Sequence, residues 1–184
     1  EYPGRDGAFR SLSIRALRAS PGTALTFRIQ AESHLLSGKA SSFVGLQTGD
    51  APRWVQRFWE RPSIDRIGWI PFQLAPQETA PADGCNAILR WGERQELYSA
   101  HGSRVQGLEA WGNRGVIVQR MADLKSAIYF GEAFDTNAAA LIPRGIEQLH
   151  LLRICSSPEY AILVRDRAPG LSITNQALVN VPQV

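Results

Sequence analysis

The segment Ser103 to Gly115, SRVQGLEAWGNRG, holds the side chains with the most evident chemical use. Arg104, Gln106, Asn113 and Arg114 are the residue types that can bind guanine or adenine edges through two hydrogen bonds in the major groove. The glycines and the tryptophan in this segment predict a loop. A long surface hairpin connection has the same composition, because surface loops are polar in most proteins.

A second segment, residues 45–59, reads GLQTGDAPRWVQRFW. Gly and Pro predict an exposed turn from Thr48 to Pro52. After it come Arg53 and Arg57, whose guanidinium groups can reach a phosphate or a guanine edge. Three large aromatic residues alternate with them, and they either fold back into the core or form a surface with the arginines. These three are Trp54, Phe58 and Trp59.

The sequence contains no motif that predicts catalysis. The nearest Gly-containing string, Trp111 to Gly115, has the wrong spacing for a dinucleotide or phosphate cradle. We therefore expect no catalytic residue and no cofactor in this chain. Asp123-Leu-Lys125 could belong to a metal-dependent nuclease, but the strand expected before it supplies no second carboxylate, and a solvated turn explains the charges as well. Cysteine and histidine are scattered, so we expect no metal site: Cys85, Cys155, His34, His101 and His150.

The length of 184 residues, with 44% hydrophobic and 20% charged residues, fits one globular domain. The net charge of +3 does not itself require a nucleic-acid partner. All basic residues except Lys39 and Lys125 are Arg, which suits guanine and phosphate but also follows from a genome that favours Arg codons. The longest apolar runs are far shorter than the roughly 20 residues of a membrane helix, so we expect no membrane segment and a cytoplasmic protein.

Short apolar runs separated by turn residues predict a multi-stranded sheet, with Trp91 in the core and Gly68 to Gln73 at a sheet edge. A helix is expected from Gly145 to Ser157, with Ile146, Leu149, Leu152 and Ile154 on its buried stripe. A second helix begins at Pro158 and ends before Pro169-Gly170. The other expected strands are Thr23 to Gln30, Ser41 to Leu46, Asn86 to Trp91, Gly115 to Met121, Ser126 to Gly131 and Ala138 to Pro143.

These elements predict a mixed α/β (α+β) fold, in which a twisted multi-stranded sheet is followed by C-terminal helices. Residues 1–11 are Gly-rich and polar, and we expect them to be the flexible end of a truncated chain. The domain itself is expected to span residues 12–184.

Several strings, taken in order, resemble one protein family: FVGLQTGDAPRWVQRFWE, RVQGLEAWGNRGVIVQRM, YFGEAFDTNAAALIP, LLRICSSPEYAILVR and LSITNQALVNVP. They are similar to the C-terminal target-recognition region of large adenine-N6 DNA methyltransferases, namely the type IIL restriction-modification enzymes and their relatives in BREX phage defence. More distantly, the turn Thr48-Gly49-Asp50-x-Pro52 and the segment Ser172 to Pro182 are similar to the borders of a target-recognition domain in type I specificity subunits. The resemblance runs from about residue 12 to the end. It departs at Arg165 to Gly170, where the family continues a helix.

The resemblance implies sequence-specific recognition of double-stranded DNA. It places the methylating part, with S-adenosylmethionine, in an upstream domain of the same polypeptide, which would be the second partner of this domain. Arg104, Gln106, Asn113 and Arg114 are then the leading base readers. Phosphate or secondary contacts are assigned to Arg53, Arg57, Gln119 and Arg120, although Arg120 could equally be a strand residue that faces solvent. The isolated domain is expected to bind DNA with micromolar or weaker affinity that falls steeply with salt.

Two other functions remain open at this point. The domain could be a protein-docking module whose exposed aromatic residues bind the methyltransferase core or a defence-system partner. It could also be an independent metal-dependent nuclease that uses Asp123.

Overall fold

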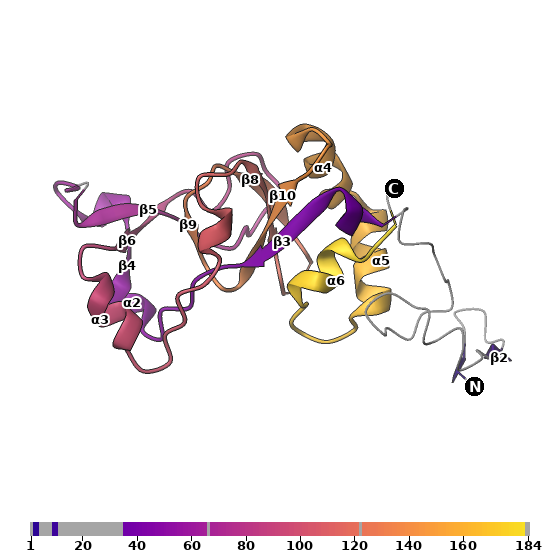
Figure 1. The fold of residues 1–184 in the computed structure, drawn as a ribbon, viewed down its shortest axis with the longest axis horizontal. Helices are drawn as coiled ribbons and strands as arrows, with labels where there is room; N and C mark the ends of the chain where they lie inside the picture. The colour runs from indigo at the N-terminus through magenta and orange to yellow at the C-terminus, as the bar shows by residue number, and fades with distance from the viewer. Residues whose placement is uncertain (1, 4–8, 11–34, 66, 122, 183–184) are drawn as a thin grey trace.

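The computed structural model of the chain describes residues 2–3, 9–10, 35–65, 67–121 and 123–182. The strand expected from Thr23 to Gln30 and the domain boundary expected at residue 12 lie outside these ranges. Near the N-terminus, β1 (Tyr2–Pro3) and β2 (Phe9–Arg10) pair antiparallel. All other elements belong to residues 35–182, which form an elongated body with a sheet in the middle, a second sheet towards one end and helices at the other (Figure 1).

The middle sheet, called the central sheet here, has the strand order β3-β10-β7-β8, and every neighbouring pair is antiparallel. The expected strands are confirmed, with ends that differ from the expected ones by at most two residues. They are β3 (Ala40–Val44), β7 (Gly115–Gln119), β8 (Ser126–Tyr129) and β10 (Ala138–Pro143).

Both faces of the central sheet are covered, which explains why its strands are almost continuously apolar. Because side chains alternate along a strand, Ala139 and Leu141 of β10 pack on the helical side with Val116 and Val118 of β7. The opposite face carries Ile117 and is packed by a second cluster. That cluster includes Tyr129, Phe134, Ala138 and Ala140.

Three helices cover one face of the central sheet (Figure 1): α4 (Gln148–Cys155), α5 (Pro158–Arg167) and α6 (Asn175–Val179). Pro158 begins α5, where the Ser157 hydroxyl accepts a hydrogen bond from the Tyr160 backbone N–H at 3.1 Å. The Tyr160 hydroxyl donates to the Leu178 carbonyl at 2.8 Å and so joins α5 to α6. The end of α5 before Pro169-Gly170 is confirmed.

The buried stripe expected on α4 is partly wrong. The helix buries Leu151, Ile154 and Cys155, whereas Leu149 is 66% exposed. Apolar residues occupy more than one side of this helix, so two phases at i, i+3 and i+4 spacing were open. Packing against β7 and β8 selects the phase that contains Leu151.

The second sheet, called the distal sheet here, has the order β4-β6-β5-β9. Together with α2 (Ala51–Trp54), the turn η4 (Phe58–Glu60) and α3 (Arg94–Ser99), it forms the distal lobe. Fully buried Trp54, Leu89 and Leu97 form the centre of its core with Phe72. The strands are β4 (Val55–Arg57), β5 (Trp69–Gln73), β6 (Ala87–Arg90) and β9 (Ala133–Phe134).

The expected mixed α/β fold is confirmed, and its larger sheets are two four-stranded ones. The edge position expected for Gly68 to Gln73 is wrong, because β5 lies between β6 and β9. Strand β9 has only two residues, and it pairs parallel with β5 from a point 61 positions further along the chain. Such a short, distant partner leaves no periodic signal in the sequence.

The two sheets are joined by a neck, defined as residues 44–47, 104–107 and 133–136. Leu46 donates its N–H to the Phe134 carbonyl at 2.7 Å, and Gln47 and Arg104 exchange backbone hydrogen bonds at 3.0 and 2.8 Å. These bonds tie three distant chain segments together, so the distal lobe is fixed by more than a single linker.

Two glycines allow the close approach of chains in the neck. A Cβ atom on Gly45 would lie 2.2 Å from the Asp135 carbonyl oxygen, and one on Gly107 would lie 2.3 Å from the Val44 carbonyl oxygen. Gly107 also has a φ of +77°, in the left-handed region that other residues rarely adopt.

The first and last parts of the body lie side by side. Leu35 forms an antiparallel bridge with Pro182, and the Leu36 N–H donates to the Val181 carbonyl at 2.8 Å. Among the helices described for residues 35–182, none is long and apolar enough to cross a membrane.

Candidate nucleic-acid interface

The exposed turn from Arg57 to Arg61 brings arginine and aromatic side chains together on the distal lobe. Phe58 is 48% exposed and Trp59 is 61% exposed, with their ring centroids 5.0 Å apart in an edge-to-face arrangement. The Arg57 guanidinium lies 5.9 Å from the Trp59 ring centroid, and that of Arg61 lies 4.6 Å from the ring of Trp69. The turn thus presents large planar groups beside positive charge.

Hydrogen bonds fix the conformation of this turn. The Glu60 carboxylate accepts from the Arg57 backbone N–H at 2.7 Å and so closes the turn at η4. The Arg57 guanidinium donates to the side-chain oxygen of Asn86, and the Phe58 N–H donates to the Asn86 carbonyl at 3.3 Å. The aromatic rings are therefore held on a rigid support.

Both interpretations of the aromatic segment, burial in the core and exposure beside the arginines, are partly confirmed. Trp54 is fully buried in the distal core, whereas Phe58 and Trp59 are on the surface. The turn before them begins as expected, with Gly49 at a φ of +73° and Pro52 in the first turn of α2, but Thr48 is buried.

The guanidinium of Arg53 is engaged within the protein. It forms an ion pair with the Glu96 carboxylate and lies 4.7 Å from the Trp54 ring centroid. Both partners of the ion pair are exposed, so the pair contributes little to stability and can open when an anion competes for the guanidinium.

The loop expected to read bases does not present its residues as one group. Gln106 donates its side-chain N–H to the Gly45 carbonyl at 2.9 Å, inside the neck. Asn113 donates to the carbonyls of Glu109 at 3.1 Å and Trp111 at 3.3 Å, which stabilises the turn after η5 (Leu108–Ala110). These amides position backbone. The Asn113 nitrogen donates to two carbonyls, whereas Gln106 keeps one N–H as well as its oxygen for another partner.

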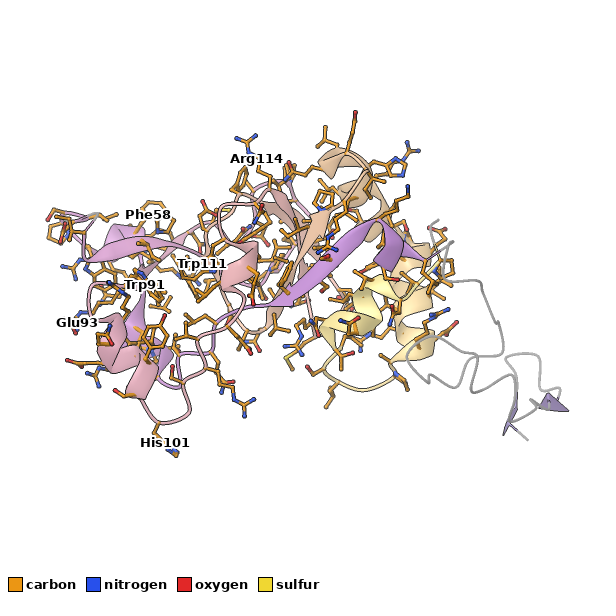
Figure 2. All side chains as sticks on the ribbon, in the orientation of Figure 1. Phe58, Trp91, Glu93, His101, Trp111 and Arg114 are labelled. Atoms are coloured by element: carbon orange, nitrogen blue, oxygen red, sulfur yellow. The ribbon has the colours of Figure 1, made fainter. Side chains whose placement is uncertain are left out.

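Arg104 and Arg114 are both exposed, and within the described chain their guanidinium groups have no hydrogen-bond or ion-pair partner. The loop nevertheless carries them to different places. Figure 2 shows Arg114 on the upper side of the molecule, as it does Phe58. Arg104 lies in the neck, where its backbone pairs with that of Gln47.

Arg120 is held inside the protein. Its guanidinium donates to the carbonyls of Ile173 at 2.8 Å and Thr136 at 2.9 Å. Burial lowers the pKa of Arg120 from its ordinary value. These contacts join the end of β7 to the segment before α6, so the Arg120 side chain has a structural role. It does not face solvent, contrary to the alternative interpretation.

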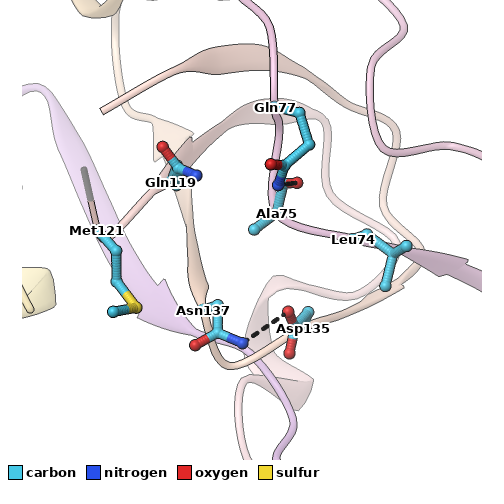
Figure 3. Close-up of a pocket in the computed structure, with 7 residues that line it drawn as sticks. All are labelled: Leu74, Ala75, Gln77, Gln119, Met121, Asp135 and Asn137. Carbon is cyan, nitrogen blue, oxygen red and sulfur yellow. Dashed lines mark hydrogen bonds between the residues drawn. The ribbon is translucent and has the colours of Figure 1, made fainter. Parts of the chain in front are cut away.

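Gln119 lines a cavity of about 340 Å³ near the neck, together with Met121, Asp135 and Asn137 (Figure 3). Asn137 donates its side-chain N–H to the Asp135 carboxylate at 3.1 Å. Burial raises the pKa of Asp135, although hydrogen bonds from Asn137 and Thr136 oppose the shift. The remaining lining residues are Leu74, Ala75 and Gln77.

Sequence patterns missed part of the exposed surface. Ile64 is 42% exposed and Ile67 is 88% exposed in the connection that follows η4. The Asp65 carboxylate accepts from the backbone N–H groups of Ile67 at 2.9 Å and Gly68 at 3.2 Å, which shapes this connection. The sequence Ser-Ile-Asp-x-Ile-Gly contains this turn signal. Trp91, expected in the core, is half-buried and packs at the core's rim.

No arrangement of side chains in the described residues supports the nuclease interpretation. Asp123 is exposed, and its carboxylate pairs with Lys125 at 3.7 Å. Across the described residues no group of three or more His, Cys, Asp or Glu side chains could hold a metal ion.

No family model matches the chain, and no curated protein matches it. Among solved structures, it is similar to the crystal structure of an HsdS subunit from Thermoanaerobacter tengcongensis, with 15% sequence identity and a TM-score of 0.48. The match covers 91% of this chain and 36% of the HsdS chain, so the chain spans about a third of that protein. We draw no functional conclusion from a likeness this distant.

Proposed function

We propose that this chain recognises specific sequences in double-stranded DNA and directs an adenine-N6 DNA methyltransferase to them, in restriction-modification or phage defence within the cytoplasm. The ordered strings given above support this assignment through their resemblance to target-recognition regions. In this proposal the methylating part and its S-adenosylmethionine belong to an upstream domain of the same polypeptide, because no motif for binding the methyl donor occurs in these 184 residues.

One observation carries the proposal. Phe58, Trp59 and Arg114 are exposed, and Figure 2 shows Phe58 and Arg114 on the upper side of the molecule. The half-buried guanidinium groups of Arg57 and Arg61 lie against the rings of Trp59 and Trp69. Guanidinium groups bind phosphates and guanine edges through paired hydrogen bonds. The rigid turn supplies fixed contacts, while Arg114 stands free to reach a base or a phosphate.

The predicted DNA-binding residues then divide by role. Arg114 is the leading base or phosphate contact, with Arg57 and Arg61 beside the aromatic rings as phosphate contacts. Arg53 joins them when its ion pair with Glu96 opens. Gln106, Asn113 and Arg120 act mainly by positioning the loop and the end of β7, and Arg104 would touch DNA only if the duplex reached the neck.

Duplex titration tests this proposal directly. Fluorescence anisotropy with a labelled duplex at low ionic strength should show micromolar or weaker binding that falls as salt rises. Arg114→Gln should weaken binding and, where Arg114 contacts a phosphate, lower the slope of log K against log salt by about 1. The matched control is Arg153→Gln, an exposed arginine on α4 at the helical end. Binding indifferent to salt, or equal for wild type and Arg114→Gln, would refute the proposal.

The recognised sequence requires the longer parent protein. A base contact made through two hydrogen bonds discriminates by roughly 1 to 3 kcal/mol, so loss of one should relax one position of the methylated motif. Methylome sequencing of cells that express the parent with Arg114→Gln would reveal this change.

A docking function has separate support at the helical end. Leu149 on α4, Ile162 on α5 and Leu171 after it are exposed, and Leu171 is 84% exposed. These residues are candidates for the contact with a methyltransferase core. The double variant Arg104→Ala/Arg114→Ala separates the two functions, because it should change methylation preference if the chain reads DNA and affect assembly alone if it only docks.

A further inference from the structure

We infer that the Phe58–Trp59 pair is a stacking site for nucleobases that are not covered by base pairing and stacking, so that the chain binds distorted DNA better than intact duplex. This inference rests on the proposed DNA recognition and assigns to these two rings a ligand class of their own. Phosphate contacts through arginine would not distinguish the two kinds of DNA.

The first step is the exposure of the rings. The distal lobe buries Trp54 completely, so it has the capacity to enclose a large aromatic residue, yet Trp59 and Phe58 remain 61% and 48% exposed. Every nucleobase has a π-face that an aromatic ring can cover regardless of sequence. A base that stacks on the exposed rings buries apolar surface that folding leaves in contact with water.

The second step is rigidity. The hydrogen bond from the Arg57 N–H to the Glu60 carboxylate and the two hydrogen bonds to Asn86 hold η4 in place before any ligand arrives. The edge-to-face contact at 5.0 Å also fixes the rings relative to each other. A base that stacks on them therefore does not have to order a flexible loop, which lowers the entropy cost of binding.

The third step is the charge around the rings, which favours a nucleic acid over an apolar protein surface. Arg57 and Arg61 place guanidinium groups on either side of the pair in sequence. The nearby acidic groups of Glu60 and Asp65 are bonded to backbone N–H groups of their own turns. The positive groups can therefore meet the phosphates that flank a stacked base.

The experiment compares two fluorescently labelled DNAs that differ only in structure. One is an intact duplex, and the other is the same duplex with a two-nucleotide stretch left unpaired at its centre. Wild-type chain should bind the second DNA more tightly. Trp59→Ala should lose about 5- to 100-fold of affinity for the unpaired DNA, while its affinity for the intact duplex changes little.

Two further variants make the result specific. Trp59→Phe keeps an aromatic ring and should retain the preference. It removes only the contribution of Trp59, one of five tryptophans, to the emission, and with it the part that base stacking quenches in the wild type. Leu149→Ala removes a comparably exposed apolar side chain from α4 and should leave the binding of both DNAs unchanged. Circular dichroism checks that each variant is folded.

The possible failures are distinguishable. If wild type binds both DNAs equally, or if Trp59→Ala weakens both by the same factor, the stacking site is refuted while DNA recognition stands. If wild type binds neither DNA at low salt, the proposed function fails and the stacking site with it.

Discussion

The indole rings of Trp91 and Trp111 meet edge to face with their centroids 5.1 Å apart. Trp91 follows β6 of the distal sheet, and Trp111 follows η5 and packs against the cores of both the distal lobe and the central sheet. Figure 2 shows both residues in the region where the two parts of the molecule meet. This contact adds a side-chain connection to the backbone bonds of the neck.

Removal of either ring should therefore lower the free energy of unfolding. In a double-mutant cycle, Trp91→Ala and Trp111→Ala should show a coupling of about 0.5 to 1.5 kcal/mol, which is typical of aromatic pairs. Urea denaturation of the four proteins measures it. Trp59→Ala, at an exposed position, should change stability by less than about 0.5 kcal/mol. If the stability changes of Trp91→Ala and Trp111→Ala add up to that of the double variant, the rings do not stabilise each other.

The neck should not tolerate a side chain at Gly107. Gly107→Ala must accommodate both the positive φ of +77° and a Cβ atom 2.3 Å from the Val44 carbonyl oxygen. Gly145→Ala is the matched control, since Gly145 has the same φ of +77° and nothing within 4 Å of the added atom. The control should cost about 1 kcal/mol from backbone strain, and Gly107→Ala should cost clearly more. Equal melting temperatures for the two variants would contradict the close approach described for the neck.

Arg120 and Arg114 should show opposite consequences of the same change. Arg120→Gln loses charged hydrogen bonds to the carbonyls of Ile173 and Thr136, which should lower the free energy of unfolding by about 1.5 to 3 kcal/mol. Arg114→Gln should leave stability within about 0.5 kcal/mol of wild type and weaken DNA binding. Thermal denaturation together with anisotropy separates the two effects. A stable Arg120→Gln protein that binds DNA poorly would restore Arg120 as a DNA contact.

Stability should depend on pH through two carboxyl groups whose pKa values are shifted in opposite directions. Burial raises the pKa of Asp135, so the folded chain holds a proton where the unfolded chain has lost it. Its contribution to the free energy of unfolding therefore falls as pH rises between the ordinary and the raised pKa. Asp135→Asn should flatten this part of the profile and leave the protein no less stable at neutral pH.

Asp83 provides the contrast. Burial acts to raise its pKa, but hydrogen bonds from the backbone N–H groups of Glu78 and Gln77 outweigh it, and the pKa is lowered. Asp83 therefore stabilises the fold above its ordinary pKa, and this stability is lost as pH falls through the lowered value. Asp83→Asn should be less stable than wild type at neutral pH. Urea denaturation across the acidic range tests both residues, and parallel profiles for the two variants would disagree with these pKa shifts.

Local patterns predicted the elements well and their assembly poorly. The strands β6, β7, β8 and β10 follow directly from short apolar runs between turn residues, and Pro158 marks the start of α5. The edge of the distal sheet could not be predicted, because it is formed by β9, a two-residue strand that joins β5 across 61 positions. Contacts of that kind are set by tertiary packing and leave no periodicity.

The candidate site shows the same limit. The residue types in the sequence indicate side chains that are chemically able to bind DNA: Arg104, Gln106, Asn113 and Arg114. A residue type does not show whether its side chain already forms hydrogen bonds within the protein. The Gln106 amide is engaged because the neck brings Gly45 within 2.9 Å of it, a contact between residues 61 positions apart. The exposure of Phe58 and Trp59, by contrast, depends on a local turn, in which the Glu60 carboxylate accepts from the Arg57 N–H three positions earlier in the sequence.

The bridge between Leu35 and Pro182 means that the polypeptide arrives at this body and leaves it at a single point. An exchange of residues 35–182 for a homologous cassette would hardly alter the spacing of whatever sequence lies on either side. Such a module can acquire a new binding preference by recombination while its host keeps its architecture.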